Sequence, residues 1–251
     1  MRASFCLALV VTFARLVTSE TEDLELRDLD VAGWDCLDRA EGTANTAGDI
    51  ERNRMKNRSH DDLSGLTSVE SAAFLKKVGE YDSRIQGKRR DELTVAQKEQ
   101  LDSYEKQIVS LTGWLVLAYA GPPESTNCGS PTFHDWHLEI VEDPSDHPPR
   151  IGDPTPIICE ITPRTERAIY RDNIRIQSLT EFLQLQDKTF QPTGHNAHKI
   201  RVTGYLLWDD EHNGSADVGT IIQSIGSDKF HHPWRATAWE IHPVLKIEVI
   251  D

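Results

Sequence analysis

The sequence predicts a mainly β protein: a five-stranded Greek-key barrel with one helix between its third and fourth strands, preceded by an α-helical or partly disordered N-terminal extension. Two observations predict this fold. The apolar pattern changes near residue 107, from short helical stripes to runs typical of β-strands. Beyond that point three strands, a helical window and two further strands follow in order. This order of elements is that of an OB-fold-like barrel.

The five predicted strands differ in their patterns. The segments IVSLTGWLVLAYA (108–120) and KIRVTGYLLWD (199–209) each contain a Gly, as strands do where they bend sharply in a small barrel. FHDWHLEIV (133–141) alternates apolar and polar residues, and PIICEIT (156–162) is short and apolar. RATAWEIHPVLKIEVI (235–250) is the longest. A β-sandwich, the main alternative, would normally need more strands than this length supplies.

Helical patterns precede the barrel and interrupt it. The segment 68–85 offers Ser68 as an N-cap, and the segment 93–108 has Thr94 and Gln97 in the spacing of a capping box. The helical window inside the barrel is QSLTEFLQLQ, at 177–186. The first two helices belong to the extension.

The N-terminal residues have the layout of a cleaved secretory signal. Arg2 is followed by an apolar run over 3–14 and by small residues up to Ser19. The run is too short to cross a bilayer as a helix, so no integral membrane segment is expected after cleavage. We therefore expect a secreted or periplasmic protein with a signal peptide at 1–19. Residues 20–106 would form the extension and residues 107–251 the barrel domain.

Three cysteines remain if the signal peptide is removed, so at most one intrachain disulfide can form. Cys159 lies in an apolar run and is interpreted as a buried hydrophobic residue. Cys36 and Cys128 are the candidate pair, although the sequence does not fix their distance. No Cys-x-x-Cys spacing of a metal site is present.

The charge balance argues against a nucleic-acid partner. The chain has 27 Lys and Arg against 41 Asp and Glu, a net charge of -14. Such a chain repels polyphosphates at long range. The partners that remain are a small molecule, a glycan or a protein. The basic island NRMKNR (53–58) is interpreted as a contact for an acidic patch of the barrel, or as an anion site.

Four segments taken together carry a resemblance to known proteins. They are HDWHLEIV, IICEIT, VTGYLLWDDEHNG and WRATAWEIHPV. The set resembles a loosely defined group of OB-fold-like bacterial proteins, mostly exported, for which no activity is established. The resemblance covers about residue 108 to the C-terminus. It implies a fold and an extracytoplasmic setting, and it implies nothing about chemistry.

Polar side chains are expected to converge on the barrel surface. In the last strand the apolar residues of one parity fill the barrel, so Glu240 and His242 face away from it. His137 and Glu160 lie in the second and third strands, which can neighbour the fifth in an OB-fold. The residues expected inside the barrel are Trp239, Ile241, Leu245, Ile247 and Val249.

Three interpretations of this patch stay open. It is a structural network of imidazoles and carboxylates beneath the extension, a divalent metal site, or a metal-free acid/base pair. Zn or Mn suits the ligand set His137, Glu160, Glu240 and His242. That set would make the protein a metal-dependent hydrolase, the alternative to our leading hypothesis.

The leading hypothesis is an exported binding or interaction module. In an OB-fold, the loops that connect the strands bind the ligand. The long connection before the last strand is the best candidate for a ligand-binding loop. Its candidate ligand-binding residues are Asp209, Asp210, Glu211, His212 and Trp234.

Overall fold

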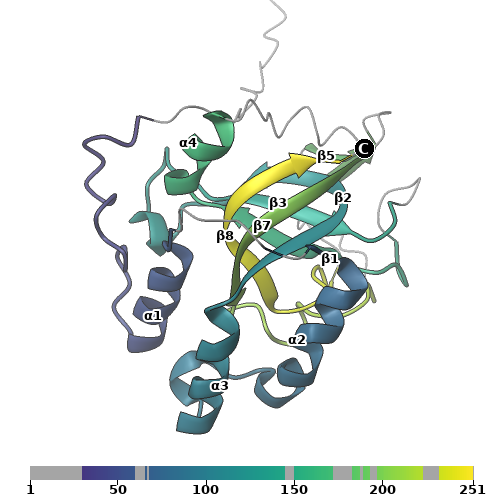
Figure 1. Cartoon of the computed structure of the whole chain (residues 1–251), viewed down its shortest axis with the longest axis horizontal. Coiled ribbons are helices and arrows are strands. Elements are labelled where there is room, and N and C mark those ends of the chain that lie inside the picture. The colour runs from purple at the N-terminus through teal and green to yellow at the C-terminus, as the bar shows by residue number, and fades with distance from the viewer. Residues whose placement is uncertain are drawn as a thin grey trace, which may run out of the picture.

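The protein is a mixed α/β structure built on a closed five-stranded barrel (Figure 1). The computed structural model describes residues 30–59, 66, 68–144, 150–171, 183–186, 189–192, 197–222 and 232–250. The barrel strands follow the order β2-β3-β4-β8-β7, and β7 pairs again with β2 to close the ring. Their bounds are β2 Ile108–Ala120, β3 Trp136–Val141, β4 Ile157–Ile161, β7 His198–Trp208 and β8 Trp239–Val249.

Neighbouring barrel strands are antiparallel except β4 and β8, which are parallel. A short outer strand, β1 (Ser68–Glu70), pairs in parallel with β2. The five barrel strands lie where the sequence predicts them. The expectation of a mainly β protein gave too little weight to the helices, which lie around the barrel in Figure 1.

The helix between the third and fourth barrel strands is present, but it is α4, Pro163–Arg171. Pro163 suits a first helical position, and the hydroxyl of Thr162 accepts a hydrogen bond from the Thr165 amide at 3.3 Å. The predicted window 177–186 is therefore wrong in part, because its last four residues form strand β5. Residues 177–182 lie outside the described residues. The hairpin there consists of β5 (Leu183–Gln186) and β6 (Thr189–Pro192).

In the part of the chain that the structure describes, three α-helices precede the barrel: α1 Ala47–Lys56, α2 Ser71–Ile85 and α3 Val95–Glu105. The capping box of α3 is as predicted, since Thr94 and Gln97 exchange side-chain to backbone hydrogen bonds. Ser68 does not cap α2, because it pairs with β2 as part of β1. Short 3₁₀ turns form at Arg90–Glu92 (η1) and Ser125–Asn127 (η2).

Helices α2 and α3 cover the part of the core around the first residue of β8. The ring of Tyr81 stacks on that of Tyr104, with centroids 5.4 Å apart, and Tyr104 lies 5.4 Å from Trp239. These contacts join the helices and the barrel into one hydrophobic core. The buried residues that α2 contributes are Phe74, Val78, Tyr81 and Ile85, at the spacing of one helical face.

A bulge in the β7–β8 ladder changes which residues enter the core. Thr203 lies opposite Lys246, whereas the next residue, Gly204, lies opposite Val244. A bulge of this kind shifts the alternation of the strand that carries the extra residue. Val244 is consequently buried and Leu245 is only half-buried, which corrects the predicted parity at that point.

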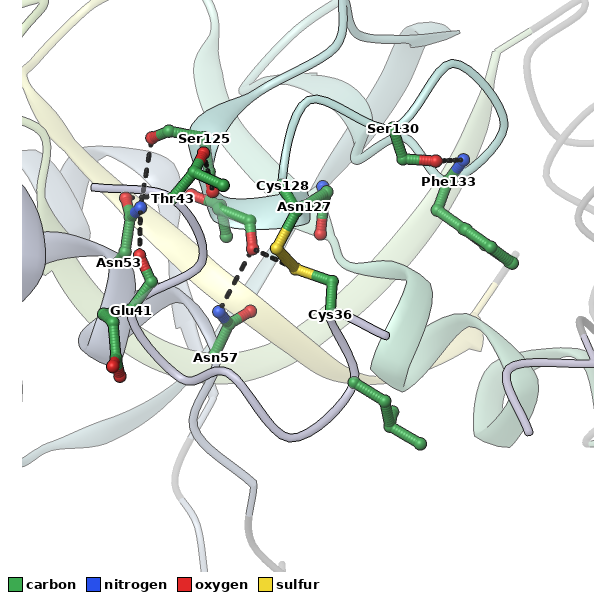
Figure 2. The surroundings of a disulfide bond; sticks show 12 residues. Cys36, Glu41, Thr43, Asn53, Asn57, Ser125, Asn127, Cys128, Ser130 and Phe133 are labelled. Atoms are coloured by element: carbon green, nitrogen blue, oxygen red, sulfur yellow. Dashed lines mark hydrogen bonds between the residues drawn. A yellow bond between two sulfur atoms is a disulfide. The ribbon is translucent and has the colours of Figure 1, made fainter. Parts of the chain in front are cut away.

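A disulfide ties the segment before α1 to the β2–β3 connection (Figure 2). It joins Cys36 and Cys128, the pairing that the sequence left open, with Cα atoms 5.9 Å apart. Asn53 of α1 donates hydrogen bonds to the Glu41 carbonyl and to Ser125 Oγ, at 2.9 and 3.0 Å. The disulfide and α1 thus hold one continuous cover over this side of the barrel.

Two further sequence expectations concern compartment and cysteine chemistry. Cys159 is a free, buried thiol, as predicted. No helix within the described ranges is long and apolar enough to cross a membrane. The predicted signal peptide lies outside the described residues.

Candidate functional site

Strands β3, β4 and β8 carry the four polar side chains that their alternation places on one face. His137 of β3 lies opposite Glu160 of β4, and β4 in turn neighbours β8. Glu240 and His242 of β8 face the same side. The four residues of the predicted metal set therefore lie together, each within ion-pair distance of another member of the set.

His242 lies at the centre of this cluster. Its Nδ1 atom is 2.9 Å from Glu160 Oε2 and 3.1 Å from Glu240 Oε1. Its Nε2 atom is 3.6 Å from Asp135 Oδ2, a distance too long for a hydrogen bond. Burial alone would lower the pKa of His242, but Glu160 and Glu240 raise it to about 10.

His137 lies on the outer side of Glu160. Its ring stacks on Tyr119, with centroids 5.1 Å apart. Nδ1 is 3.5 Å from Glu160 Oε1, and Nε2 is 3.8 Å from Glu124 Oε1. Neither ring nitrogen has a hydrogen-bond partner among the described residues. Burial opposes protonation, yet Glu160 and Glu124 raise the pKa of His137 to about 9.

Lys56, the last residue of α1, inserts an ammonium group between two of these carboxylates. Its Nζ atom is 3.1 Å from Glu124 Oε2 and 3.8 Å from Glu160 Oε2. Burial would lower the pKa of Lys56, but the carboxylates raise it well above its usual value. Conversely, burial would raise the pKa of Glu124, and Lys56 lowers it to about 2. The basic island of the sequence thus contacts the acidic face of the barrel.

Arg235 neutralises the inner end of the cluster. Its guanidinium donates to Asp209 Oδ2 at 2.9 Å and to Glu240 Oε2 at 2.7 Å. The guanidinium is fully buried. Burial would raise the pKa of Asp209, but Arg235 and Lys56 lower it below its usual range. One fixed cation therefore pairs with both Asp209 and Glu240.

Asp210 anchors the helical cover to the barrel. It accepts a hydrogen bond from the Arg52 guanidinium at 2.9 Å and another from the Arg90 amide at 3.0 Å. Arg90 in turn forms a two-point ion pair with Glu105 of α3. Asp210 is buried, so its role is to hold α1 and η1 in place.

A pocket of about 290 Å³ opens next to the cluster. Arg52, Asn53 and Lys56 of α1 form one wall, and residues 122–126 of the β2–β3 connection form another. His137 and Glu160 lie in its floor. The third wall consists of Asp209, Glu211 and His212, which follow β7. Three of the five loop candidates thus line a pocket.

The other two loop candidates do not line it. Asp210 is buried beneath Arg52. Trp234 is half-buried and donates its indole N–H to Asp217 Oδ1 at 3.0 Å, while the His212 ring meets it edge-on at 5.1 Å. Trp234 therefore supports His212 from behind.

The predicted set lies on the outer face of the barrel strands, but that face is covered. Glu240 and His242 are fully buried and Glu160 is 3% exposed, because α1 and the disulfide-linked loop cover that face. Glu240 and His242 are out of reach of a substrate in this conformation, and Glu160 meets the pocket only at its floor. His137 and Glu124, with side chains 12% and 21% exposed, are the members of the cluster closest to solvent.

Sequence reasoning missed several members of the cluster. Asp135 stands two residues before His137 in an alternating segment, so the same parity argument could have found it. Glu124 and Arg235 carried no comparable signal, because each lies in an irregular connection. Lys56 was identified as basic, but its partners were decided by the fold.

The arrangement pairs charge with charge, and burial raises the pKa of the Asp135 carboxyl to about 6. The pKa values of His137 and His242 lie well above 7, and that of Glu124 lies well below. Among the described residues, two groups have ligand atoms close enough for a metal ion. They are Glu124, His137 and Glu160, and Asp135, Glu160 and His242. Lys56 already supplies a cation to the first group.

A scan with protein-family models finds no match to this chain, and searches of curated proteins and of solved structures find no significant similarity.

Proposed function

We propose that this protein is an exported OB-fold-like binding module that holds a small, neutral, hydroxyl-rich ligand, such as a sugar unit of a glycan, in the pocket beside α1. The observation that carries the proposal is the position of the pocket. Its walls come from the β2–β3 and β7–β8 connections of the barrel. In an OB-fold these are the first-to-second and fourth-to-fifth strand connections, which bind oligosaccharides and oligonucleotides.

The strand order supports the OB-fold part of this proposal. Numbered along the chain, the barrel strands close in the order first, second, third, fifth, fourth, with the third and fifth parallel. A helix, α4, follows the third strand. Five barrel strands with a helix after the third strand are the arrangement expected of an OB-fold.

The pairing of charges favours a neutral ligand. The Glu211 side chain lies 2.9 Å from Arg52, and Glu124 lies 3.1 Å from Lys56, so the ionic groups of the wall already have partners. A charged ligand would have to break such a pair. Hydroxyl groups both donate and accept hydrogen bonds, which suits a wall that mixes carboxylates, amide and hydroxyl groups. The volume is at the lower end for ligand sites, which limits the ligand to about one sugar ring.

Nucleic acid fits this site poorly. The chain carries a net charge of -14, and Glu124 and Glu211 lie at the pocket mouth. Phosphate groups would approach carboxylates instead of a basic stripe. Of the two ligand classes that OB-folds bind, the saccharide is therefore the better match.

An extracytoplasmic setting is consistent with the disulfide between Cys36 and Cys128. Structural disulfides persist in oxidising compartments and are rare in the cytosol. The signal-peptide layout of the first residues points the same way.

The hydrolase alternative receives less support from the geometry. A catalytic metal keeps an open coordination position that a substrate can reach. Glu160, Glu240 and His242 are covered, and the exposed end of the cluster holds the ammonium group of Lys56.

The test is a titration of the full chain, disulfide intact, with a panel of neutral mono- and disaccharides. Binding is measured by isothermal titration calorimetry and by the NMR signals of the His137 imidazole. Ser125→Trp places a large ring at the pocket mouth and should weaken sugar binding at least tenfold. Thr132→Trp, an exposed position of the same connection outside the pocket, should bind like the wild type.

Two results would overturn the proposal. One is that no saccharide of the panel binds at millimolar concentration. The other is that a single-stranded oligonucleotide binds more tightly than any sugar and loses affinity in Ser125→Trp. That result would mean that the pocket binds nucleic acid and not a saccharide.

A further inference from the structure

Two buried polar atoms face each other in the cluster without hydrogen-bond partners. His242 Nε2 and Asp135 Oδ2 are 3.6 Å apart, and both side chains are fully buried. Within the described residues neither atom has a hydrogen-bond partner. Leaving such atoms unsatisfied in the interior is destabilising, so their arrangement needs a physical reason.

Both side chains are held in place through their other polar atom. Asn127 donates a hydrogen bond to Asp135 Oδ1 at 2.8 Å, which leaves Oδ2 free. Glu240 lies 3.1 Å from His242 Nδ1, which favours the imidazole tautomer with its proton on Nδ1. A metal ion that replaces the Nε2 proton would bind the Nε2 lone pair, 3.6 Å from Asp135 Oδ2. A carboxylate that fixes a histidine in this way is the usual outer partner of a metal-bound imidazole.

The separation of the two atoms suits a shared ion. Bonds of about 2.0–2.1 Å at a tetrahedral angle place two ligand atoms about 3.3 Å apart, close to the 3.6 Å observed. Asp135, Glu160 and His242 each have a ligand atom within 4.8 Å of a ligand atom of the other two, so the Glu160 carboxylate can offer a third ligand. These three residues come from β3 with its preceding loop, from β4 and from β8.

The charge of the cluster also calls for added positive charge. Its carboxylates are Glu124, Asp135, Glu160, Asp209 and Glu240, and its fixed cations are Lys56 and Arg235. With both imidazoles neutral the carboxylates exceed the fixed cations by three. Two protons on the imidazoles or one divalent cation would each reduce the excess to one.

We propose that Asp135 Oδ2, His242 Nε2 and the Glu160 carboxylate bind one divalent cation of the zinc class as a structural site. The ion would join β3, β4 and β8 beneath α1. Because the three ligand residues are buried, the ion would not act on a substrate. This ligand set differs from the one the sequence predicted. Glu240 is held by Arg235 and acts as the outer partner of His242, while His137 faces the pocket. The inference does not rest on the proposed ligand of that pocket.

The test measures metal content. The full chain is purified from zinc-supplemented culture, and a second sample is unfolded and refolded with Zn²⁺, or with Mn²⁺, under oxidising conditions at pH 8. At that pH protons compete less for the imidazole. Elemental mass spectrometry should find one zinc per chain. Removal of the metal with a chelator should lower the melting temperature.

Variants locate the metal. Asp135→Asn keeps the size of the side chain and its contact with Asn127, and it should reduce zinc affinity at least tenfold. His242→Gln should do the same. The matched control is Glu124→Gln, which removes a carboxylate of the outer group and should keep one zinc per chain.

Two results would overturn the inference. The first is less than about a tenth of an equivalent of metal in both wild-type samples, which would leave a proton or a water between the two atoms. The second is loss of zinc in Glu124→Gln with full retention in Asp135→Asn, which would place the ion in the outer group. If His242→Gln does not fold, Asp135→Asn and Glu124→Gln still decide the question.

Discussion

Arg235 donates a hydrogen bond to Glu240 at 2.7 Å, and the two side chains form a fully buried ion pair between residues five positions apart in the chain. The same guanidinium binds Asp209, which comes from the other end of the β7–β8 connection. One cation therefore closes the long loop onto the last barrel strand and neutralises the carboxylate that orients His242.

Replacement of Arg235 by Met should destabilise the protein by about 3–5 kcal/mol, because Asp209 and Glu240 would stay buried without their cation. Denaturant unfolding measures the change. Arg201→Met is the matched control, since its pair with Glu248 is more than a third exposed and 3.8 Å long. It should cost about 0–1 kcal/mol. Equal losses in the two variants would contradict the role assigned to Arg235.

The pH dependence of stability should carry a contribution from Glu139. Burial raises the pKa of this carboxyl to about 8 from its usual 4.5, against an opposing effect of His137. The folded state then holds the proton more tightly than the unfolded state does. The free energy of unfolding should consequently fall as the pH rises from about 4.5 to about 8.

Glu139→Gln tests this contribution, because it keeps the shape of the protonated side chain and removes the titration. Urea unfolding at pH 5, 6, 7 and 8 should give a smaller fall for the variant than for the wild type. Parallel curves over this range would show that Glu139 is not the group responsible.

Reduction of the disulfide should loosen the cover over the pocket. A crosslink between Cys36 and Cys128, 92 residues apart, is expected to contribute about 2–4 kcal/mol. Treatment with a phosphine reductant should lower the melting temperature and expose the segment before α1 to proteases. The double variant Cys36→Ala and Cys128→Ala should already have the lower melting temperature and should not respond to reductant. A wild type that is indifferent to reduction would contradict this prediction.

The glycine of the β7–β8 bulge should not tolerate a side chain. A Cβ atom on Gly204 would overlap the Pro243 carbonyl oxygen and lie 2.6 Å from Ile241 Cγ2. Gly204→Ala should therefore destabilise the protein by about 1–3 kcal/mol, measured by thermal or denaturant unfolding.

Gly79→Ala provides the opposite control. Gly79 lies in the exposed face of α2 and has nothing within 4 Å of the added methyl group, so the substitution should stabilise by about 0.5–1 kcal/mol. If both glycine variants changed stability in the same direction, the close packing at the bulge would not be the cause.

Elements with a local signal could be predicted correctly from the sequence alone. The strand segments at 108–120 and 133–141, and the Thr94 and Gln97 cap of α3, depend on side-chain periodicity and on contacts three residues apart. The same alternation placed His137, Glu160, Glu240 and His242 on one face. The sequence prediction was wrong for the helix of the barrel, which begins at Pro163 after Thr162 and forms α4. The alternation was wrong at Leu245, because a bulge places Val244 in the core.

The tertiary structure decided which charges meet and which are covered. Lys56 pairs with Glu124 across 68 residues, and Arg52 pairs with Asp210 across 158. No local pattern encodes such distances, because they depend on how α1 is folded back and tied by Cys36 and Cys128. That cover turns a patch predicted for the surface into a buried network. It leaves the pocket as the part of the site that a ligand can reach.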